Sequence, residues 1–168
     1  MTRASASASP DDSAMQDEDV AKRVAELLGE RVIATAESCT AGRVAEALAS
    51  VEKAAEFFRG GLVAYQEEIK RDLLGVPAGS VLTAEAAEQM ASGAAELFGA
   101  DVTVSTTGVA GDAEEDGTPP GTVYIGTQVD GVVASKVHRF EGSPQQICDQ
   151  ARRQALVDLV DAMSSAPR

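Results

Sequence analysis

Three short segments of this sequence carry residues able to do chemistry, and the first is the run from Glu37 to Gly42, which reads ESCTAG. It follows a short β-branched stretch and precedes a helical pattern, so Ser38 is predicted to lie at a strand-to-helix turn. Free backbone N–H groups at a helix start attract a phosphate or the oxyanion of an acyl-transfer intermediate. Ser38 is therefore a candidate nucleophile. The alternative is structural, since Ser and Thr are preferred helix N-caps.

A serine nucleophile needs a base, and the second segment offers Tyr65 with Lys70 five residues later. Tyr65 ends a predicted strand and Lys70 lies about one helical turn beyond it, so both reach the same sheet edge. A lysine desolvated among apolar neighbours has a lowered pKa and can act as a base. The tyrosine can relay the proton or hold the lysine. The alternative for Lys70 is a solvated position on a helix face.

Two other residues compete for these roles. Cys39 directly follows Ser38, and a thiolate is intrinsically the better nucleophile. We rank it second because a residue immediately after a serine at such a turn is expected to point away from the same pocket. His138 is the only histidine. It lies in a strand-like stretch, which favours a partly exposed strand residue over a member of a Ser-His-Asp triad.

The third segment runs from Thr106 to Gly121 and is rich in Gly, Asp, Glu and Pro. Small residues after a strand let backbone amides approach an anion closely, which makes the segment a candidate phosphate cradle. It matches neither the P-loop nor the dinucleotide pattern. A mobile lid over residues 113–120 is an equal alternative.

The elements that position these segments alternate between strands and helices. We predict strands at 31–36, 60–65, 101–106, 122–129 and 132–140, and helices from Asp17, after Gly42, after Tyr65, from Thr83 and over 145–163. The N-cap signature at Thr83 and the Asp130-Gly131 hairpin signature support these boundaries. The pattern predicts a single-domain layered α/β/α fold with a mixed sheet of about five strands, spanning 15–163 between disordered tails at 1–14 and 164–168.

Composition narrows the possible partners. The chain has 168 residues and a net charge of −13, so we expect no binding to nucleic acid. It has no membrane-spanning run and no secretory signal, which predicts a cytoplasmic protein. An acidic, lysine-poor surface favours a host rich in salt. Two cysteines cannot form a disulfide framework or a four-ligand zinc site, and no cofactor is expected. Leu- and Val-bearing helices favour a homo-oligomer.

Together the segments resemble the CinA carboxy-terminal domain family, a competence/damage-inducible group with nicotinamide mononucleotide deamidase activity. The matching stretches read AESCTAG, GGLVAYQEEIKRDLLGV, TGVAG and GTVYIG, in that order and at the family's spacing. The resemblance covers roughly Val20 to Met163. The companion amino-terminal domain of longer members is missing, so the chain resembles the stand-alone form.

The resemblance implies an amidohydrolase that converts nicotinamide mononucleotide to nicotinic acid mononucleotide and ammonia, without metal or cofactor. The family's serine, tyrosine and lysine fall on Ser38, Tyr65 and Lys70. The residues it places around the substrate are Glu37, Cys39, Thr40, Gly42, Thr107, Gly108, Ala110 and Gly111. Two alternatives remain: a non-catalytic nucleotide- or partner-binding module of the same fold, and a hydrolase of a different amide.

Three departures from the family pattern concern the surroundings of the serine. Ala41 replaces a glycine, which is tolerable if the residue is helical. The acidic run from Asp112 to Asp116 replaces a glycine-rich stretch and adds negative charge near a phosphate site. Near the last helix the family reads Gly-Asp-Arg and then Ile-Arg, where this chain has Gly142-Ser143-Pro144 and Ile147-Cys148, so two arginine contacts are absent. These changes leave the serine chemistry intact and affect phosphate recognition.

Overall fold

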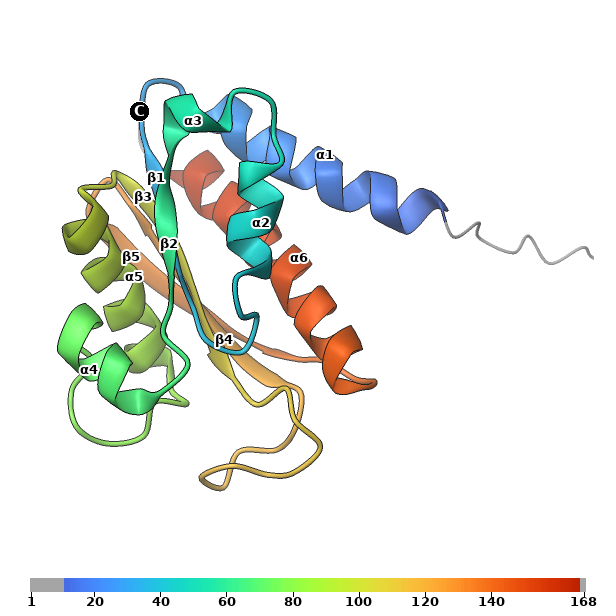
Figure 1. The fold of residues 1–168 in the computed structure, drawn as a ribbon, viewed down its shortest axis with the longest axis vertical. Helices are drawn as coiled ribbons and strands as arrows, with labels where there is room; N and C mark the ends of the chain where they lie inside the picture. The colour runs from blue at the N-terminus through green and yellow to red at the C-terminus, as the bar shows by residue number, and fades with distance from the viewer. Residues whose placement is uncertain (1–10, 167–168) are drawn as a thin grey trace, which may run out of the picture.

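The five strands form one mixed sheet in the computed structural model, which describes residues 11–166 (Figure 1). The strand order is β2-β1-β3-β4-β5. The strands β1 (Ile33–Glu37), β2 (Phe58–Val63) and β3 (Val102–Gly108) run parallel. The strands β4 (Thr122–Val129) and β5 (Val132–Arg139) continue the sheet antiparallel. The predicted α/β class and mixed five-stranded sheet are confirmed.

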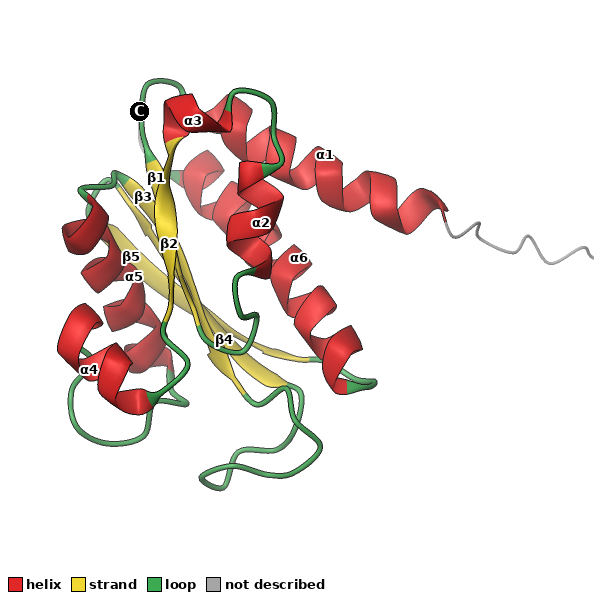
Figure 2. Cartoon of the chain, viewed as in Figure 1, coloured by secondary structure: helices red, strands yellow, loops and turns green. Residues whose placement is uncertain are grey.

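Helices cover both faces of the sheet (Figure 2). One face carries α1 (Asp11–Leu28), α2 (Arg43–Ala49) and α6 (Pro144–Ser165), packed over Ile33, Val104 and Ile125 of the strands. The other face carries α4 (Glu67–Leu74) and α5 (Ala84–Phe98). Each face buries its own apolar cluster, which gives three layers.

Hydroxyl side chains of β3 attach α5 closely to the sheet. The hydroxyl of Thr103 donates to the Ala91 carbonyl at 2.7 Å, and that of Ser105 donates to the Ala87 carbonyl at 2.6 Å. Opposite them, a Cβ on Gly126 would lie 2.3 Å from the Ala87 carbonyl oxygen, so only glycine fits there. These bonds satisfy buried hydroxyls and fix the height of the helix above the strand.

Several element boundaries differ from prediction. Helix α1 begins at Asp11 rather than Asp17, and α6 ends at Ser165 rather than Met163, so both helices extend into the predicted tails. The remaining tail residues, 1–10 and 167–168, lie outside the described part of the chain. Strand β2 begins two residues earlier than predicted and ends at Val63. The short helix α3 (Ala54–Phe57), just before it, was not predicted.

The helix starts follow local chemistry. At α5 the Thr83 hydroxyl accepts a hydrogen bond from the Ala86 N–H at 3.0 Å, as predicted. At α6, Ser143 and Gln146 form a reciprocal capping box with Pro144 in the first turn. The residues that replace the family's Gly-Asp-Arg thus begin this helix. Among the described residues, none of the helices combines the length and apolar character that a bilayer crossing requires.

Candidate active site

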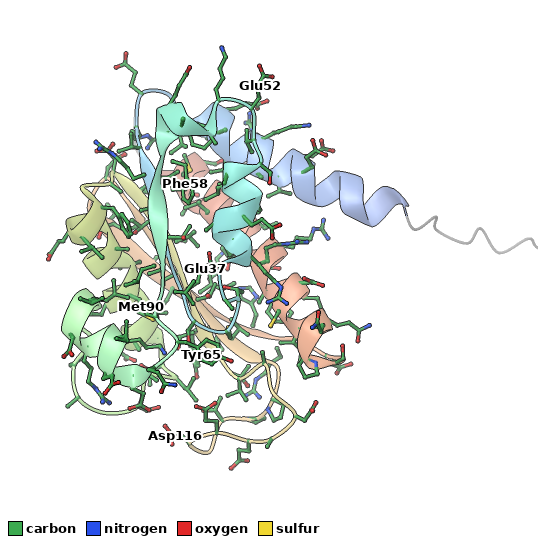
Figure 3. The ribbon with its side chains drawn as sticks, viewed as in Figure 1. Glu37, Glu52, Phe58, Tyr65, Met90 and Asp116 are labelled. Carbon is green, nitrogen blue, oxygen red and sulfur yellow. The ribbon has the colours of Figure 1, made fainter. Side chains whose placement is uncertain are left out.

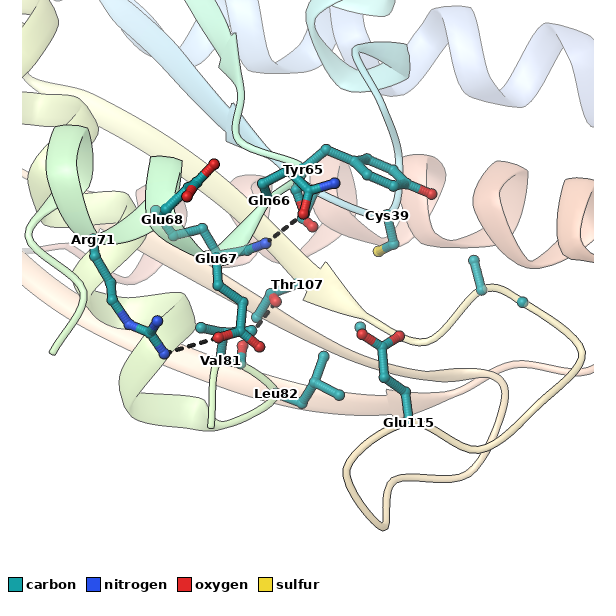
Figure 4. A pocket seen from close by; sticks show the side chains of 15 residues that line it. Cys39, Tyr65, Gln66, Glu67, Glu68, Arg71, Val81, Leu82, Thr107 and Glu115 are labelled. Atoms are coloured by element: carbon teal, nitrogen blue, oxygen red, sulfur yellow. Dashed lines mark hydrogen bonds and ion pairs between the residues drawn. The ribbon is translucent and has the colours of Figure 1, made fainter. Parts of the chain in front are cut away.

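A cavity of about 610 Å³ lies beyond the carboxyl ends of the parallel strands β1, β2 and β3. Ligands in open α/β sheets bind at this edge. Side chains around the cavity come from segments far apart in the sequence (Figures 3 and 4). Its lining comprises Ser38, Cys39, Tyr65, Gln66, Glu67, Glu68, Lys70, Arg71, Val81, Leu82, Thr107, Gly108, Ala110, Gly111 and Glu115. The structure therefore brings together the three predicted catalytic residues.

The turn between β1 and α2, residues 37–42, is called the elbow below, and the Glu37 carboxylate holds it in shape. One carboxylate oxygen accepts hydrogen bonds from the Thr40 hydroxyl at 2.6 Å, the Gly42 N–H at 3.0 Å and the Val44 N–H at 3.1 Å. The other oxygen accepts from the Ala45 N–H at 2.7 Å. Glu37 is only 1% exposed. A buried carboxylate is tolerated when donors satisfy it in this way.

This network corrects two expectations. Glu37, Thr40 and Gly42, predicted to contact the substrate, do not line the cavity, because they bond to one another within the elbow. The first N–H groups of α2 are also not free to bind an anion, because the Glu37 carboxylate occupies them. Within the described chain, the N–H groups of Cys39 and Thr40 donate to no other residue. Only Cys39 of these two lines the cavity, so its amide, rather than those of the helix, is the one that the elbow offers a ligand.

Thr106, at the end of β3, ties the elbow to the neighbouring strand. Its carbonyl accepts from the Ser38 N–H at 3.0 Å, and its hydroxyl lies 2.8 Å from the Thr40 hydroxyl. The residue is fully buried. Sequence reasoning placed Thr106 at a strand end and gave it no role. The hydrogen bonds fix the backbone of Ser38, so Thr106 is a positioning residue.

Lys70 is a buried lysine at the bottom of the cavity, with only 2% of its surface exposed. Its ammonium donates to the Tyr65 carbonyl at 3.1 Å (Figure 4). Burial lowers the pKa of Lys70, and the nearby charges of Glu67, Cys39 and Glu115 act in the opposite direction. A depressed pKa enlarges the neutral fraction, which is the form able to take a proton. The expectation of a solvated lysine is therefore wrong.

Tyr65 contributes to the site differently from the prediction. Its main-chain carbonyl holds Lys70, while 64% of its surface is exposed and its ring lies at the cavity edge. Among the described residues, neither the Ser38 hydroxyl nor the Tyr65 phenol forms a hydrogen bond with Lys70. A proton relay through the phenol is thus not formed in this arrangement. The tyrosine holds the Lys70 side chain through its own backbone carbonyl.

Cys39 lines the cavity beside Ser38, contrary to the expectation that it points away. Burial raises the pKa of the Cys39 thiol to about 12. A thiol with such a pKa is protonated at neutral pH and is a poor nucleophile. Behind the elbow, the Cys148 thiol donates to the Cys39 carbonyl at 3.1 Å. At this position, where the resemblance implied an arginine, the chain supports the elbow with a small buried side chain.

The segment 107–111, which includes the last two residues of β3, also lines the cavity, but its residues do not all act as the predicted substrate contacts. The Thr107 hydroxyl donates to the Val81 carbonyl at 2.8 Å, so it is already engaged. A Cβ on Gly108 would lie 2.4 Å from the Thr122 carbonyl oxygen, so this glycine serves strand packing. Within the described chain, the N–H groups of Ala110 and Gly111 have no partner. Those two amides are the donors that this segment offers a ligand.

Four charged residues of the lining were not singled out from the sequence: Glu67, Glu68, Arg71 and Glu115. Glu67 and Arg71 form an ion pair of 2.9 Å on α4. The helical spacing of Glu67 and Arg71 around Lys70 was the feature that could have indicated them. Glu115 comes from residues 112–120, called the acidic loop below. No spacing rule connects it to the elbow.

Two further features lie away from the cavity. His138 bonds to the buried Asp158 of α6 at 2.7 Å, which confirms a strand position outside any triad with Ser38. Within residues 11–166, no group of three or more His, Cys, Asp or Glu side chains is placed to hold a metal ion.

We compared the chain with known protein families and with solved structures. The family model described as "CinA C-terminal domain" matches residues 17–163. The chain belongs to the CinA C-terminal domain family. Protein YdeJ of Escherichia coli is 33% identical over 159 residues, covering 88% of this chain and 92% of its own. A CinA-like protein of Mycolicibacterium vanbaalenii is 38% identical over 141 residues, or 80% of this chain and 33% of its own. The chain thus spans nearly all of one CinA relative and about a third of the other.

Solved CinA structures share the fold. A CinA superfamily protein from Klebsiella pneumoniae aligns with a TM-score of 0.85 at 32% identity, covering 89% of this chain and 99% of its own. A competence/damage-inducible protein from Agrobacterium tumefaciens aligns with a TM-score of 0.81 at 29% identity, covering 89% and 96%. The three-layer architecture that positions the cavity is therefore a property of the CinA family.

Proposed function

We propose that this domain is an amidohydrolase that converts nicotinamide mononucleotide to nicotinic acid mononucleotide and ammonia, with Ser38 as nucleophile and Lys70 as base. One observation carries the proposal: Ser38 and a buried lysine with a lowered pKa line the same cavity. Family membership supports it, because the matched region contains both residues.

In the proposed reaction, the neutral Lys70 amine takes the Ser38 hydroxyl proton as Oγ bonds to the carboxamide carbon. The N–H group of Cys39, whose residue lines the cavity, stabilises the negative carbonyl oxygen. The C–N bond then breaks, Lys70 returns the proton to the leaving nitrogen, and ammonia departs from an acyl-serine. Water, deprotonated by Lys70, attacks this ester and releases the carboxylate, and the proton returns to Ser38.

The geometry explains why serine rather than cysteine is proposed as the nucleophile. The Ser38 hydroxyl has no hydrogen-bond partner among the described residues, so it is available to substrate and base. Burial raises the pKa of the Cys39 thiol to about 12, so at neutral pH this residue lacks the thiolate that would make it the better nucleophile. The positive charge that Lys70 gains lies next to Glu67 and Glu115, which stabilise it during the transfer.

The test is ammonia release from nicotinamide mononucleotide by the purified protein, compared with the Ser38→Ala and Cys39→Ala variants. We expect Ser38→Ala to lower turnover at least about a thousandfold, because removing a nucleophile removes the covalent path. Cys39→Ala is the matched control and should keep most of the activity. Release that survives in Ser38→Ala rejects the serine mechanism. No release by the folded wild-type protein rejects this substrate and favours a different amide or a binding module.

A further inference from the structure

The cavity carries more negative than positive charge. Its ionisable lining contains the carboxylates of Glu67, Glu68 and Glu115 and the cations Lys70 and Arg71. Arg71 is already paired with Glu67 at 2.9 Å, and burial favours the neutral form of Lys70. Among the described residues, neither Glu68 nor Glu115 forms an ion pair or a side-chain hydrogen bond. The site therefore has unpaired negative charge to offer a ligand.

Of the two unpaired carboxylates, that of Glu115 faces the reacting groups. Figure 4 shows it reaching from the acidic loop towards the cavity, on the side facing Cys39, whereas the Glu68 carboxylate turns away. The negative charge of Glu115 acts on Lys70, which puts this carboxylate within electrostatic range of the proposed base. Glu115 is thus the unpaired carboxylate of the lining that faces into the cavity.

The position of Glu115 is fixed by its loop. Its N–H donates to the Thr118 carbonyl at 3.1 Å, and its carbonyl accepts from the Thr118 N–H at 2.8 Å. Between them, Asp116 and Gly117 have φ values of 48° and 73°, the left-handed pair of a type I′ turn. At the base of the loop, the Gly121 N–H donates to the Val109 carbonyl at 2.7 Å. This hairpin presents Glu115 to the cavity in a defined way.

We propose that Glu115 is a specificity-determining residue that selects carboxamides carried on a positively charged ring over those on a neutral ring. The inference rests on the proposed function, since the ring of a nicotinamide nucleotide is a pyridinium cation. Glu115 is exposed, and a carboxylate at the cavity wall attracts that cation across the short distance of a bound ligand. The same carboxylate repels the phosphate of a nucleotide. The proposed selection between ligands therefore depends on the charge of the ring and not on the phosphate.

A role of Glu115 through Lys70 alone makes a different prediction. If the carboxylate served only to tune the lysine, its removal would change catalysis equally for cationic and neutral rings. It would leave ligand binding to an inactive enzyme unchanged. Binding measured in the Ser38→Ala background therefore separates charge recognition from catalysis.

The experiment measures binding of nicotinamide riboside and its 1,4-dihydro form to Ser38→Ala by calorimetry. The two ligands have the same sugar and amide and no phosphate, and only the first has a charged ring. Adding Glu115→Gln should weaken binding of the cationic ligand about three- to tenfold and leave the dihydro ligand unchanged. Glu114→Gln is the matched control, because it removes the same charge from the neighbouring residue, which does not line the cavity.

The outcomes separate the two proposals. Equal effects of Glu115→Gln on both ligands, no effect on either, or an equal effect of Glu114→Gln overturn the role of Glu115. Failure of the Ser38→Ala protein to bind the cationic ligand also overturns it. If the cationic preference is present but the wild-type protein releases no ammonia from any of these amides, only the proposed function fails.

Discussion

The elbow and the acidic loop face each other across one cavity and are built in opposite ways. In the elbow, the Thr40 hydroxyl bonds to Glu37 and Thr106, and the Gly42 N–H donates to Glu37. The side chains of Glu37, Thr40 and Thr106 are buried. The acidic loop is mostly exposed, and its turn is closed by backbone bonds between Glu115 and Thr118. A change at Glu37 or Thr40 should therefore disturb the elbow, whereas the loop can change its charges at little cost to the fold.

This contrast assigns different tasks to the two sides. A nucleophile and its oxyanion donors must be held within a fraction of an ångström, which the buried network of the elbow provides. Ligand charge is felt over several ångströms, so a carboxylate on a surface hairpin is sufficient to read it. The elbow carries the proposed nucleophile Ser38, and the acidic loop carries the charge proposed to read the ligand.

The largest loss of activity is expected from a substitution of Lys70, the proposed base for the serine of the elbow. Lys70→Met should lower ammonia release about a hundred- to ten-thousandfold, because the general base is lost. The free energy of unfolding should not fall, since an apolar side chain of similar length suits a buried position better than a lysine. Kinetics together with urea denaturation checks both results. A large loss of stability would show that Lys70 has a structural role instead.

The pH dependence of ammonia release tests the same proposed role of Lys70. Burial lowers the pKa of Lys70, so the neutral base becomes available below the ordinary lysine range. Release of ammonia should rise with pH and reach a plateau before pH reaches about 10.4, the ordinary lysine value. Because the folded protein holds fewer protons on Lys70 than the unfolded chain, this group makes stability rise with pH across that window. A flat profile would contradict Lys70 as base.

The next largest effect is a loss of stability, expected when the hydrogen bonds inside the elbow are disrupted. Glu37→Gln should lower the free energy of unfolding by about 2 to 4 kcal/mol, because an amide nitrogen would face donors that now bond to a carboxylate. Denaturant unfolding measures this loss. The matched control, Glu46→Gln on the outer side of α2, should stay within about 0.5 kcal/mol of wild type. Equal stability of both variants would refute the role assigned to Glu37.

A smaller effect concerns salt. Raising ionic strength from low to molar salt should lower the KM for nicotinamide mononucleotide a few-fold, because salt screens the acidic loop from the substrate phosphate. The turnover number should change less, since hydrogen bonds in the elbow are buried from the ions. Steady-state kinetics at matched pH checks this. A KM that rises with salt would show that attraction to the cationic ring outweighs repulsion of the phosphate.

The smallest expected effect lies at Ala41. Its φ is 49°, so it is left-handed rather than helical, and the expectation that a helical backbone would accommodate the methyl group is wrong. Ala41→Gly should raise the free energy of unfolding by about 0.5 to 1 kcal/mol, because glycine adopts this conformation without strain. Thermal unfolding can resolve it. A destabilised variant would mean that the gain in unfolded-state entropy dominates.

The architecture followed from the sequence because its causes are local. Alternating runs, the Asp130-Gly131 turn and the Thr83 cap each depend on residues within a few positions, and β4 has the predicted bounds. The nearness of Ser38 and Lys70 followed from the rule that ligands gather where parallel strands end. The helix α3, only four residues long, left no periodic pattern to detect.

The parts of the site that were missed depend on contacts between distant residues. Glu37 looked like a substrate contact because its position in the motif does not reveal that four donors surround its carboxylate. Thr106 lies 68 positions from Ser38 in sequence, yet it fixes the serine backbone. Glu115 belongs to an acidic run that was recognised in the sequence, but the turn that directs this one carboxylate to the cavity was not predicted. Such contacts depend on tertiary packing, and the periodic pattern of apolar residues in the sequence does not predict them.

The burial of Cys39 and Cys148 has a practical consequence for following the cavity in solution. These are the only thiols of the chain, and burial raises the pKa of each, so both react slowly with alkylating reagents at neutral pH. A cysteine introduced on the exposed acidic loop would then be the one fast-reacting thiol. A fluorophore attached there would report ligand entry from a single known position, because the two native cysteines would remain unlabelled.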